Sequence, residues 1–159
     1  MKKKLALILV LGSLVFSGLS GCTDPNAVFD QNIEVANHNW SYANRVKFNV
    51  NIQDETVPYN LFLNLRVSGS YRYSNIFILF YQTSPGKKTA GTRYEYKLAN
   101  ADGEWLGSGS GNIYSYQVPL RTNYKFPAKG VYHFEIEQNM RDNPLHDVID
   151  AGLRVAKAQ

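Results

Sequence analysis

The chain has 159 residues, one domain's worth, with 17 Lys plus Arg against 13 Asp plus Glu and a formal net charge of +4. Three of those basic residues, Lys2, Lys3 and Lys4, precede an apolar run at the N-terminus. The chain after that run has 14 basic residues (17 minus 3) and 13 acidic ones, so its formal net charge is +1. A near-neutral chain gives no reason to expect a nucleic-acid partner.

The N-terminus has the pattern of a secretory signal peptide. The basic start is followed by an apolar run from Leu5 to Phe16, which is shorter than the roughly 20 residues that a membrane-spanning helix requires. Leu19 to Cys22 then read Leu-Ser-Gly-Cys, which resembles the lipobox at which lipoprotein precursors are acylated and cut. We therefore expect residues 1–21 to be a removed signal peptide and Cys22 to be the lipidated residue.

Cys22 is the only cysteine of the chain, so no disulfide can form within it. A sulfur that carries lipid as a thioether is no longer available as a nucleophile. Two or more acyl chains hold a protein stably in a membrane, so membrane lipid is the first expected partner. Residues 22–26 then form a short lipidated tether, and residues 27–159 form one domain close to the membrane.

The tether also bears on which side of the membrane the domain faces. Asp24 is the one acidic residue near Cys22, whereas a signal for export to the cell surface would show several. We therefore expect a lipid-anchored protein of the cell envelope that faces the periplasm.

Apolar and polar residues alternate along much of the remaining chain. The clearest case is Arg45 to Gln53, whose every second residue is Val or another large apolar residue, a spacing typical of a half-buried strand. Similar alternation predicts strands at 59–67, 93–98, 114–118, 132–136 and 149–155, the last with Ile149, Ala151, Leu153 and Val155 facing the core. The segment 76–81 is apolar at every position, so we expect a central strand whose second face is covered by a loop or a partner.

This spacing of strands indicates the fold class. Seven to eight strands separated by turn-rich stretches, with no helical period between them, favour a single antiparallel β-sandwich of the immunoglobulin-like kind. Gly130 followed by Tyr132 at the start of a strand is similar to the tyrosine corner of such sandwiches.

Histidine and aspartate residues are the candidates for catalysis or metal binding, and each has a simpler interpretation. His133 falls on the polar face of its strand, and His38 lies in a loop between two asparagines. His146 and Asp147 could begin a metal site, but no third ligand lies nearby in the sequence. Three aspartates lack the spacing of a calcium loop: Asp142, Asp147 and Asp150. We predict no catalytic residue, no metal and no cofactor.

Three alternate glycines at Gly107, Gly109 and Gly111 are similar to a phosphate-binding loop. They lack the lysine and the strand-to-helix context that such a loop requires. The string therefore indicates a turn or a bulge.

Three stretches carry a resemblance to a known family. They are PYNLFLNLRVSGSYRYSNIFILF from Pro58, LANADGEWLGSGSGNIYSYQV from Leu98 and KFPAKGVYHFEIEQNMRDNPLHDVIDAGLRV from Lys125. The chain resembles the gliding motility lipoprotein GldH family of the Bacteroidota over nearly the whole predicted domain. The resemblance implies a non-catalytic part in the envelope machinery for gliding, with other gliding lipoproteins and the type IX secretion system as partners. The resembled family also occurs in relatives that do not glide, so envelope assembly and secretion support are alternative roles.

A glycan-binding module is the second hypothesis. Exposed aromatic residues of β-sandwiches often stack on sugars, and four tyrosines could form such a face: Tyr71, Tyr73, Tyr114 and Tyr116. The alternative is that these rings line the core and the rim, with their hydroxyl groups at the solvent edge.

The loop from Asp102 to Asn112 is the expected site of a protein partner, because loops carry function more often than core strands do. Trp105 and Leu106 stand between glycines there, with Gly107 and Gly109 following, and a tryptophan on a rigid turn is a common anchor of protein interfaces. The competing hypothesis is that Trp105 folds back and closes one end of the sandwich.

We predict that Cys22→Ala blocks lipidation and processing, because the lipoprotein peptidase recognises the acylated cysteine. The uncut precursor should accumulate, as it should in wild-type cells treated with globomycin, and palmitate labelling with gel mobility measures both effects. Mature protein that is cut before residue 22 without carrying palmitate would show that the lipobox interpretation is wrong.

Overall fold

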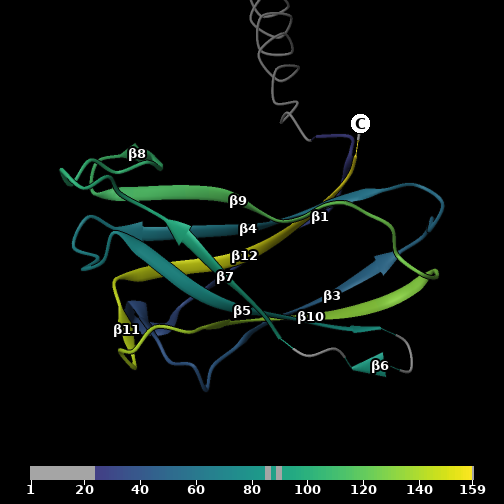
Figure 1. Ribbon diagram of the computed structural model, residues 1–159, viewed down its shortest axis with the longest axis horizontal. Coiled ribbons are helices and arrows are strands. Elements are labelled where there is room, and N and C mark those ends of the chain that lie inside the picture. The colour runs from purple at the N-terminus through teal and green to yellow at the C-terminus, as the bar shows by residue number, and fades with distance from the viewer. Residues whose placement is uncertain (1–23, 85–86, 89–90, 159) are drawn as a thin grey trace, which may run out of the picture.

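The computed structural model describes residues 24–84, 87–88 and 91–158. Two five-stranded antiparallel sheets stack as the layers of a sandwich (Figure 1), which confirms the expected all-β fold. The predicted signal peptide and Cys22 lie outside the described residues, so the lipidation site stays a prediction.

Each sheet has a simple strand order. Sheet A runs β1-β12-β4-β9-β8 and consists of β1 (Ala27–Glu34), β12 (Val148–Lys157), β4 (Tyr59–Ser68), β9 (Ile113–Tyr124) and β8 (Ser108–Ser110). Sheet B runs β3-β10-β5, with β6 and β7 both pairing with β5, and consists of β3 (Val46–Ile52), β10 (Gly130–Gln138), β5 (Asn75–Ser84), β6 (Lys87–Lys88) and β7 (Thr92–Lys97). A 3-10 turn (Ala36–His38) precedes a small pair formed by β2 (Asn39–Trp40) and β11 (Leu145–His146).

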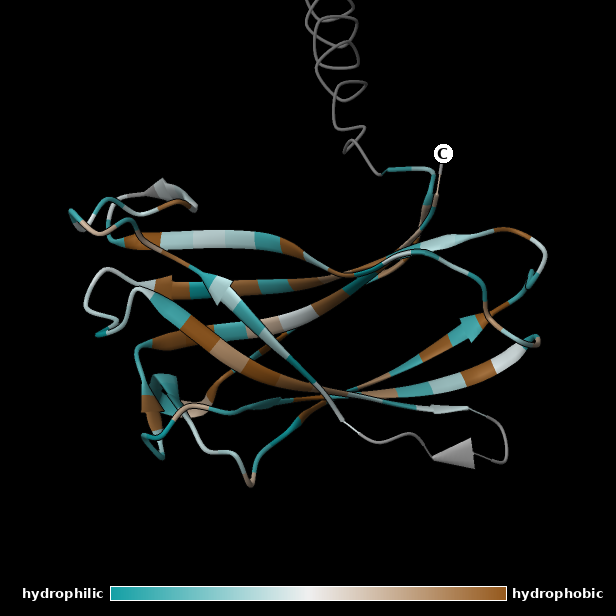
Figure 2. Ribbon diagram, in the orientation of Figure 1, coloured by the Kyte–Doolittle hydropathy of each residue, from teal (hydrophilic) through white to brown (hydrophobic). Residues whose placement is uncertain are grey.

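The predicted alternation is confirmed most clearly in β3 and β4. All four apolar residues of β3 are buried and the three residues between them are exposed, as the alternating colours of this strand show (Figure 2). β4 likewise buries every second residue from Tyr59 to Val67. Both strands direct their apolar side chains into the space between the sheets, where the core forms.

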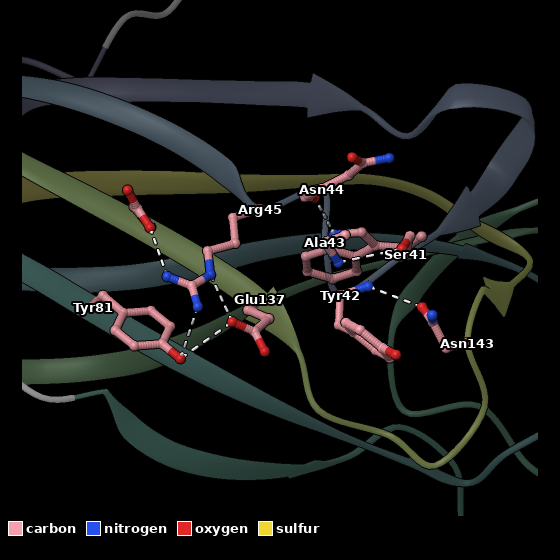
Figure 3. A network of polar contacts seen from close by, with 10 residues as sticks. Ser41, Tyr42, Ala43, Asn44, Arg45, Tyr81, Glu137 and Asn143 are labelled. Atoms are coloured by element: carbon pink, nitrogen blue, oxygen red, sulfur yellow. Dashed lines mark hydrogen bonds and ion pairs between the residues drawn. The ribbon is translucent and has the colours of Figure 1, made fainter.

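The apolar segment 76–81 lies in β5, a central strand of sheet B, as expected. β5 buries Ile76, Ile78 and Phe80 in the core. Its outer face is covered by arginines: the guanidinium carbon of Arg93 lies 3.9 Å from the ring centroid of Phe77, and that of Arg45 lies 4.2 Å from the centroid of Tyr81. Arg45 is fixed over its ring by Glu137 (Figure 3). Side chains of the domain itself therefore provide the cover that we expected from a loop or a partner.

Two features of sheet A differ from the expectation. The alternation of apolar and polar residues does not predict strand β1. This strand lies at the edge of the sheet, and its inward-facing Gln31 and Ile33 remain exposed. In β12, a register shift between Val148 and Asp150 places Val148 in the core and leaves Ile149 half-buried, so the prediction for Ile149 was wrong by one residue.

A cluster of aromatic rings fills one end of the core. Phe126 lies between β9 and β10, with its ring centroid 4.6 Å from that of Tyr132, 4.9 Å from Tyr124 and 5.3 Å from Tyr59. Its position outside any strand explains why alternation does not reveal it. Contacts of this kind add to the stabilisation from burying the rings.

Tyr132 forms the tyrosine corner that its position predicts. Its ring is fully buried, and its hydroxyl donates a hydrogen bond of 2.7 Å to the backbone carbonyl of Ala128, four residues upstream. The hydroxyl also accepts a bond of 3.3 Å from the Ala128 backbone N–H. This bond fastens the connection between β9 and β10 to the end of the core.

The sandwich has two unlike ends. At the tether end, the backbone N–H of Lys157 donates to the Asn26 carbonyl (2.9 Å), so the chain enters the domain beside its C-terminal strand. β4 runs from this end, where Tyr59 pairs with Lys157, to the far end, where Ser68 pairs with Ile113. Ten strand residues at about 3.3 Å each separate the two ends by roughly 30 Å.

We predict that Tyr132→Phe lowers the free energy of unfolding by about 0.5–1.5 kcal/mol, because it removes the hydrogen bonds of the hydroxyl to the Ala128 backbone and keeps the ring. Tyr42→Phe is the matched control, since Tyr42 is 52% exposed, and it should change stability by less than about 0.5 kcal/mol. Urea unfolding of both variants measures the difference, and equal stabilities would contradict the role given to the corner.

Candidate functional site

Trp105 joins the far end of the sandwich rather than projecting from it. It pairs with Ala99 across an isolated bridge, and its ring stacks on Tyr114 with centroids 5.0 Å apart and planes 24° from parallel. The side chain is half-buried and packs on the edge of the core. Trp105 therefore combines features of the plug and of the surface anchor, the two hypotheses drawn from the sequence.

Leu106, the next residue, is the exposed member of this turn. Its side chain is 51% exposed, while its backbone N–H donates to the Leu98 carbonyl (2.9 Å) and holds the turn against the sandwich. Ile113, at the start of β9, is a second exposed apolar residue of the same hairpin, at 40%. Trp105 and Leu106, neighbours on this turn, form what we call the far-end patch, and Ile113 is a further exposed apolar residue at the same end of the sandwich.

Two of the alternate glycines leave room for the rings of two tyrosines of the neighbouring strand β9. A Cβ atom on Gly107 would fall 2.6 Å from the Cζ atom of Tyr116, and one on Gly109 would fall 2.9 Å from the Cδ1 atom of Tyr114. Both distances are shorter than a real contact allows, so a larger residue at either position would displace the tyrosine ring beside it. Gly107 and Gly109 therefore allow close packing within this hairpin.

The four tyrosines considered for sugar stacking also gather at the far end, but two of them are buried. Tyr71 is 4% exposed and Tyr116 is 8% exposed, and their hydroxyls donate to the backbone carbonyls of Asn75 (3.1 Å) and Leu98 (2.8 Å). Burial raises the pKa of both phenols. These two rings cannot stack on a ligand without leaving the core.

The other two tyrosines are half-buried. The ring of Tyr114 is stacked against the ring of Trp105, and the Tyr73 hydroxyl donates to the carboxylate of Asp142. This hydrogen bond raises the pKa of Tyr73. Tyr73 borders two hollows, one of about 430 Å³ shared with Phe77, Met140 and Arg141 and another of about 370 Å³ shared with Trp105. The loop after β10, which the sequence does not mark as functional, thus helps to form the far end.

The loops of the far end are tied to one another (Figure 3). The backbone N–H of Tyr42 donates to the side-chain oxygen of Asn143 (3.0 Å). The indole N–H of Trp40 donates to the Asn44 carbonyl (3.0 Å) and fixes the same turn. The first bond joins the segment before β3 to the segment after β10, and the second closes a turn within the segment before β3.

The candidate metal-binding residues do not come together. Asn39 lies 2.5 Å from the Nδ1 atom of His146, whereas Asp147 accepts a hydrogen bond of 2.9 Å from Ser68. His133 lies on the outer face of sheet B beside Asn49, as its position predicts. The three aspartates have separate partners: Tyr73 for Asp142, Ser68 for Asp147 and Arg66 for Asp150.

Residues 24–84, 87–88 and 91–158 contain no group of three His, Cys, Asp or Glu residues arranged to hold a metal ion. The same part of the chain has no helix that is long and apolar enough to cross a membrane.

We predict that Trp105→Ala lowers the free energy of unfolding by about 1–3 kcal/mol, less than the loss of about 3–5 kcal/mol for a fully buried tryptophan. Leu106→Ala should cost less than about 0.5 kcal/mol, since a solvated side chain loses few contacts. Denaturant unfolding compares the two neighbours directly. A Trp105→Ala protein as stable as Leu106→Ala would show that the stack on Tyr114 does not hold the turn.

Comparison with known proteins agrees with the resemblance seen in the sequence. The family model described as GldH lipoprotein matches residues 27–155. The Gliding motility lipoprotein GldH homolog of Christiangramia forsetii is 33% identical over 146 residues, which cover 87% of this chain and 88% of the relative. The Gliding motility lipoprotein GldH of Flavobacterium johnsoniae is 30% identical over 160 residues, with 96% of each chain covered. The chain belongs to the GldH lipoprotein family.

Proposed function

We propose that this chain is a lipid-anchored, non-catalytic interaction component of the gliding-motility envelope machinery, which works beside the type IX secretion system. Lipid on Cys22 anchors the protein, and the domain faces the periplasm. The chain belongs to a family whose members are named for gliding motility, and this membership supports a part in gliding. The far-end patch supports the proposal that the protein acts by binding another protein.

The far-end patch has the properties of a protein-binding anchor. Leu106 is a large apolar side chain, 51% exposed, on a turn that the Trp105 stack and the backbone bond to Leu98 hold in place. A side chain whose position is fixed before binding loses little conformational entropy in a complex. Apolar anchors of this kind contribute a large share of the binding energy of protein interfaces.

The position of the patch fits a protein held at a membrane. The chain enters the domain at the tether end, and the patch lies roughly 30 Å away at the far end. A domain anchored at one end therefore presents Leu106 and Ile113 away from the lipid surface, where a partner of the envelope machinery can reach them.

A gliding relative provides a test of this proposal. Its own gene for the protein is replaced by the gene for this chain carrying Leu106→Asp. We expect protein of normal stability and lipidation, together with loss of spreading on agar and of adhesin secretion, because a charge cannot be buried unpaired in an interface. Val131→Asp is the matched control, since Val131 is 46% exposed but lies in β10 near the tether end. Normal gliding with stable Leu106→Asp protein would overturn the proposal.

A further inference from the structure

The outer face of sheet A has an arrangement of side chains that the proposed function does not use. Three rows of residues cross the sheet, each formed by residues that pair directly on neighbouring strands. The middle row is Asn32, Gly152, Asn64 and Gln117. The row toward the tether is Asp30, Arg154, Phe62 and Pro119, and the row toward the far end is Glu34, Asp150, Arg66 and Ser115.

Hydrogen bonds link the three amides of the middle row into a chain. Gln117 donates to the side-chain oxygen of Asn64 (3.0 Å), and Asn64 donates to the side-chain oxygen of Asn32 (3.1 Å). Gly152 makes this possible, because a Cβ atom there would fall 2.1 Å from the Asn32 oxygen. The amide of Asn32 thus lies over the backbone of β12 and reaches the next strand.

Charged pairs hold the rows on either side. Arg154 donates to Asp30 (2.6 Å) and to Asp24. Arg66 pairs with Asp150, a carboxylate whose residue is only 1% exposed, and this hydrogen bond raises the pKa of Arg66. Both arginines are thus held by carboxylates, and with Glu34 the face has more acidic than basic groups, so it is polar without an excess of positive charge.

Two hollows lie on this face, and Gln117 lines both. One, of about 230 Å³, also contacts Asn64 and Ser108, below the β8 hairpin. The other, of about 380 Å³, contacts Phe62 and Asn60 and extends to Asp24 at the tether end. Phe62 is a half-buried aromatic ring on this face. Gln117 is common to the two hollows, which we together call the amide trough.

We infer that the amide trough binds an N-acetylated polysaccharide, such as the glycan strands of peptidoglycan. Planar amide groups offer donors and acceptors side by side, which matches both the hydroxyl pairs of a sugar and the N–H and C=O of an acetamido group. Phe62 provides an apolar ring on which the C–H face of a pyranose can pack.

The chemistry of the trough favours this ligand over other macromolecules. Nucleic acid requires an excess of positive charge to replace the counterions of its phosphates, and here the charges are paired within the protein. The centre of a protein interface is depleted of charged residues, whereas the rows on either side of the middle row hold two arginines and three carboxylates, Asp30, Glu34 and Asp150. The trough also begins at Asp24, next to the predicted lipid anchor, and a periplasm-facing domain meets an N-acetylated glycan there.

Cosedimentation with purified peptidoglycan sacculi tests the inference, with the full-length lipidated protein in detergent. We expect saturable binding that soluble chitohexaose displaces. Gln117→Ala and Phe62→Ala should each weaken binding by at least about fivefold, the size expected when one hydrogen bond or one packing contact is lost. Gln117 is exposed and Phe62 is half-buried, so both variants should fold, and melting curves verify this.

Asn49→Ala is the matched control, because Asn49 is an exposed amide on the outer face of sheet B, and it should bind sacculi as the wild type does. Failure of the wild type to bind sacculi, unchanged binding by folded Gln117→Ala and Phe62→Ala, or binding to purified lipopolysaccharide alone would each overturn the inference. None of these outcomes depends on Leu106, so the test is separate from that of the proposed function.

Discussion

The position of β12 between β1 and β4 is the constraint on which the rest of the structure depends. β12 is the last strand of the chain, and it pairs along its length with β1 on one edge and with β4 on the other. It buries Ala151, Leu153 and Val155 in the core. Because β1 pairs with no other strand of the described sheets, the segment that follows the tether is attached to the domain through the C-terminal strand.

This arrangement determines where each surface lies. The antiparallel pairing of β1 with β12 brings the tether and the C-terminal residues to one end, and the register of β4 then places the β8–β9 hairpin at the other end. Gly152 of β12 lets Asn32 extend across the strand toward Asn64. The far-end patch and the amide trough therefore both depend on the pairing of β12, although they lie on different parts of the surface.

The sequence predicts those features that depend on local chemistry or on period-two alternation. The lipobox is a motif of four neighbouring residues, and β3 and β4 alternate because one face of each packs on the core. Tyr132 could be predicted because a tyrosine corner requires a tyrosine near the start of a strand.

The remaining features arise from contacts between residues far apart in the chain. Strand β1 is an exposed edge strand, so it lacks a buried face that would show as alternation. Phe126 enters the core from a connection, and the hydrogen bond from Tyr73 to Asp142 spans 69 positions. The amide row exists only when the registers of β1, β12, β4 and β9 are known. The sequence predicts Trp105 as either an interface anchor or a plug of the sandwich, whereas its stack on Tyr114 depends on tertiary packing.

Site-specific photocrosslinking in living, gliding cells tests the role of the far end most directly. A benzoylphenylalanine residue would replace Leu106 in one strain and Val131, which lies near the tether end, in another. If the far-end patch binds its partner, we expect a crosslink from position 106 to a protein of the gliding or secretion machinery and none from position 131. A crosslink to that machinery from position 131 with none from position 106 would contradict the proposed function.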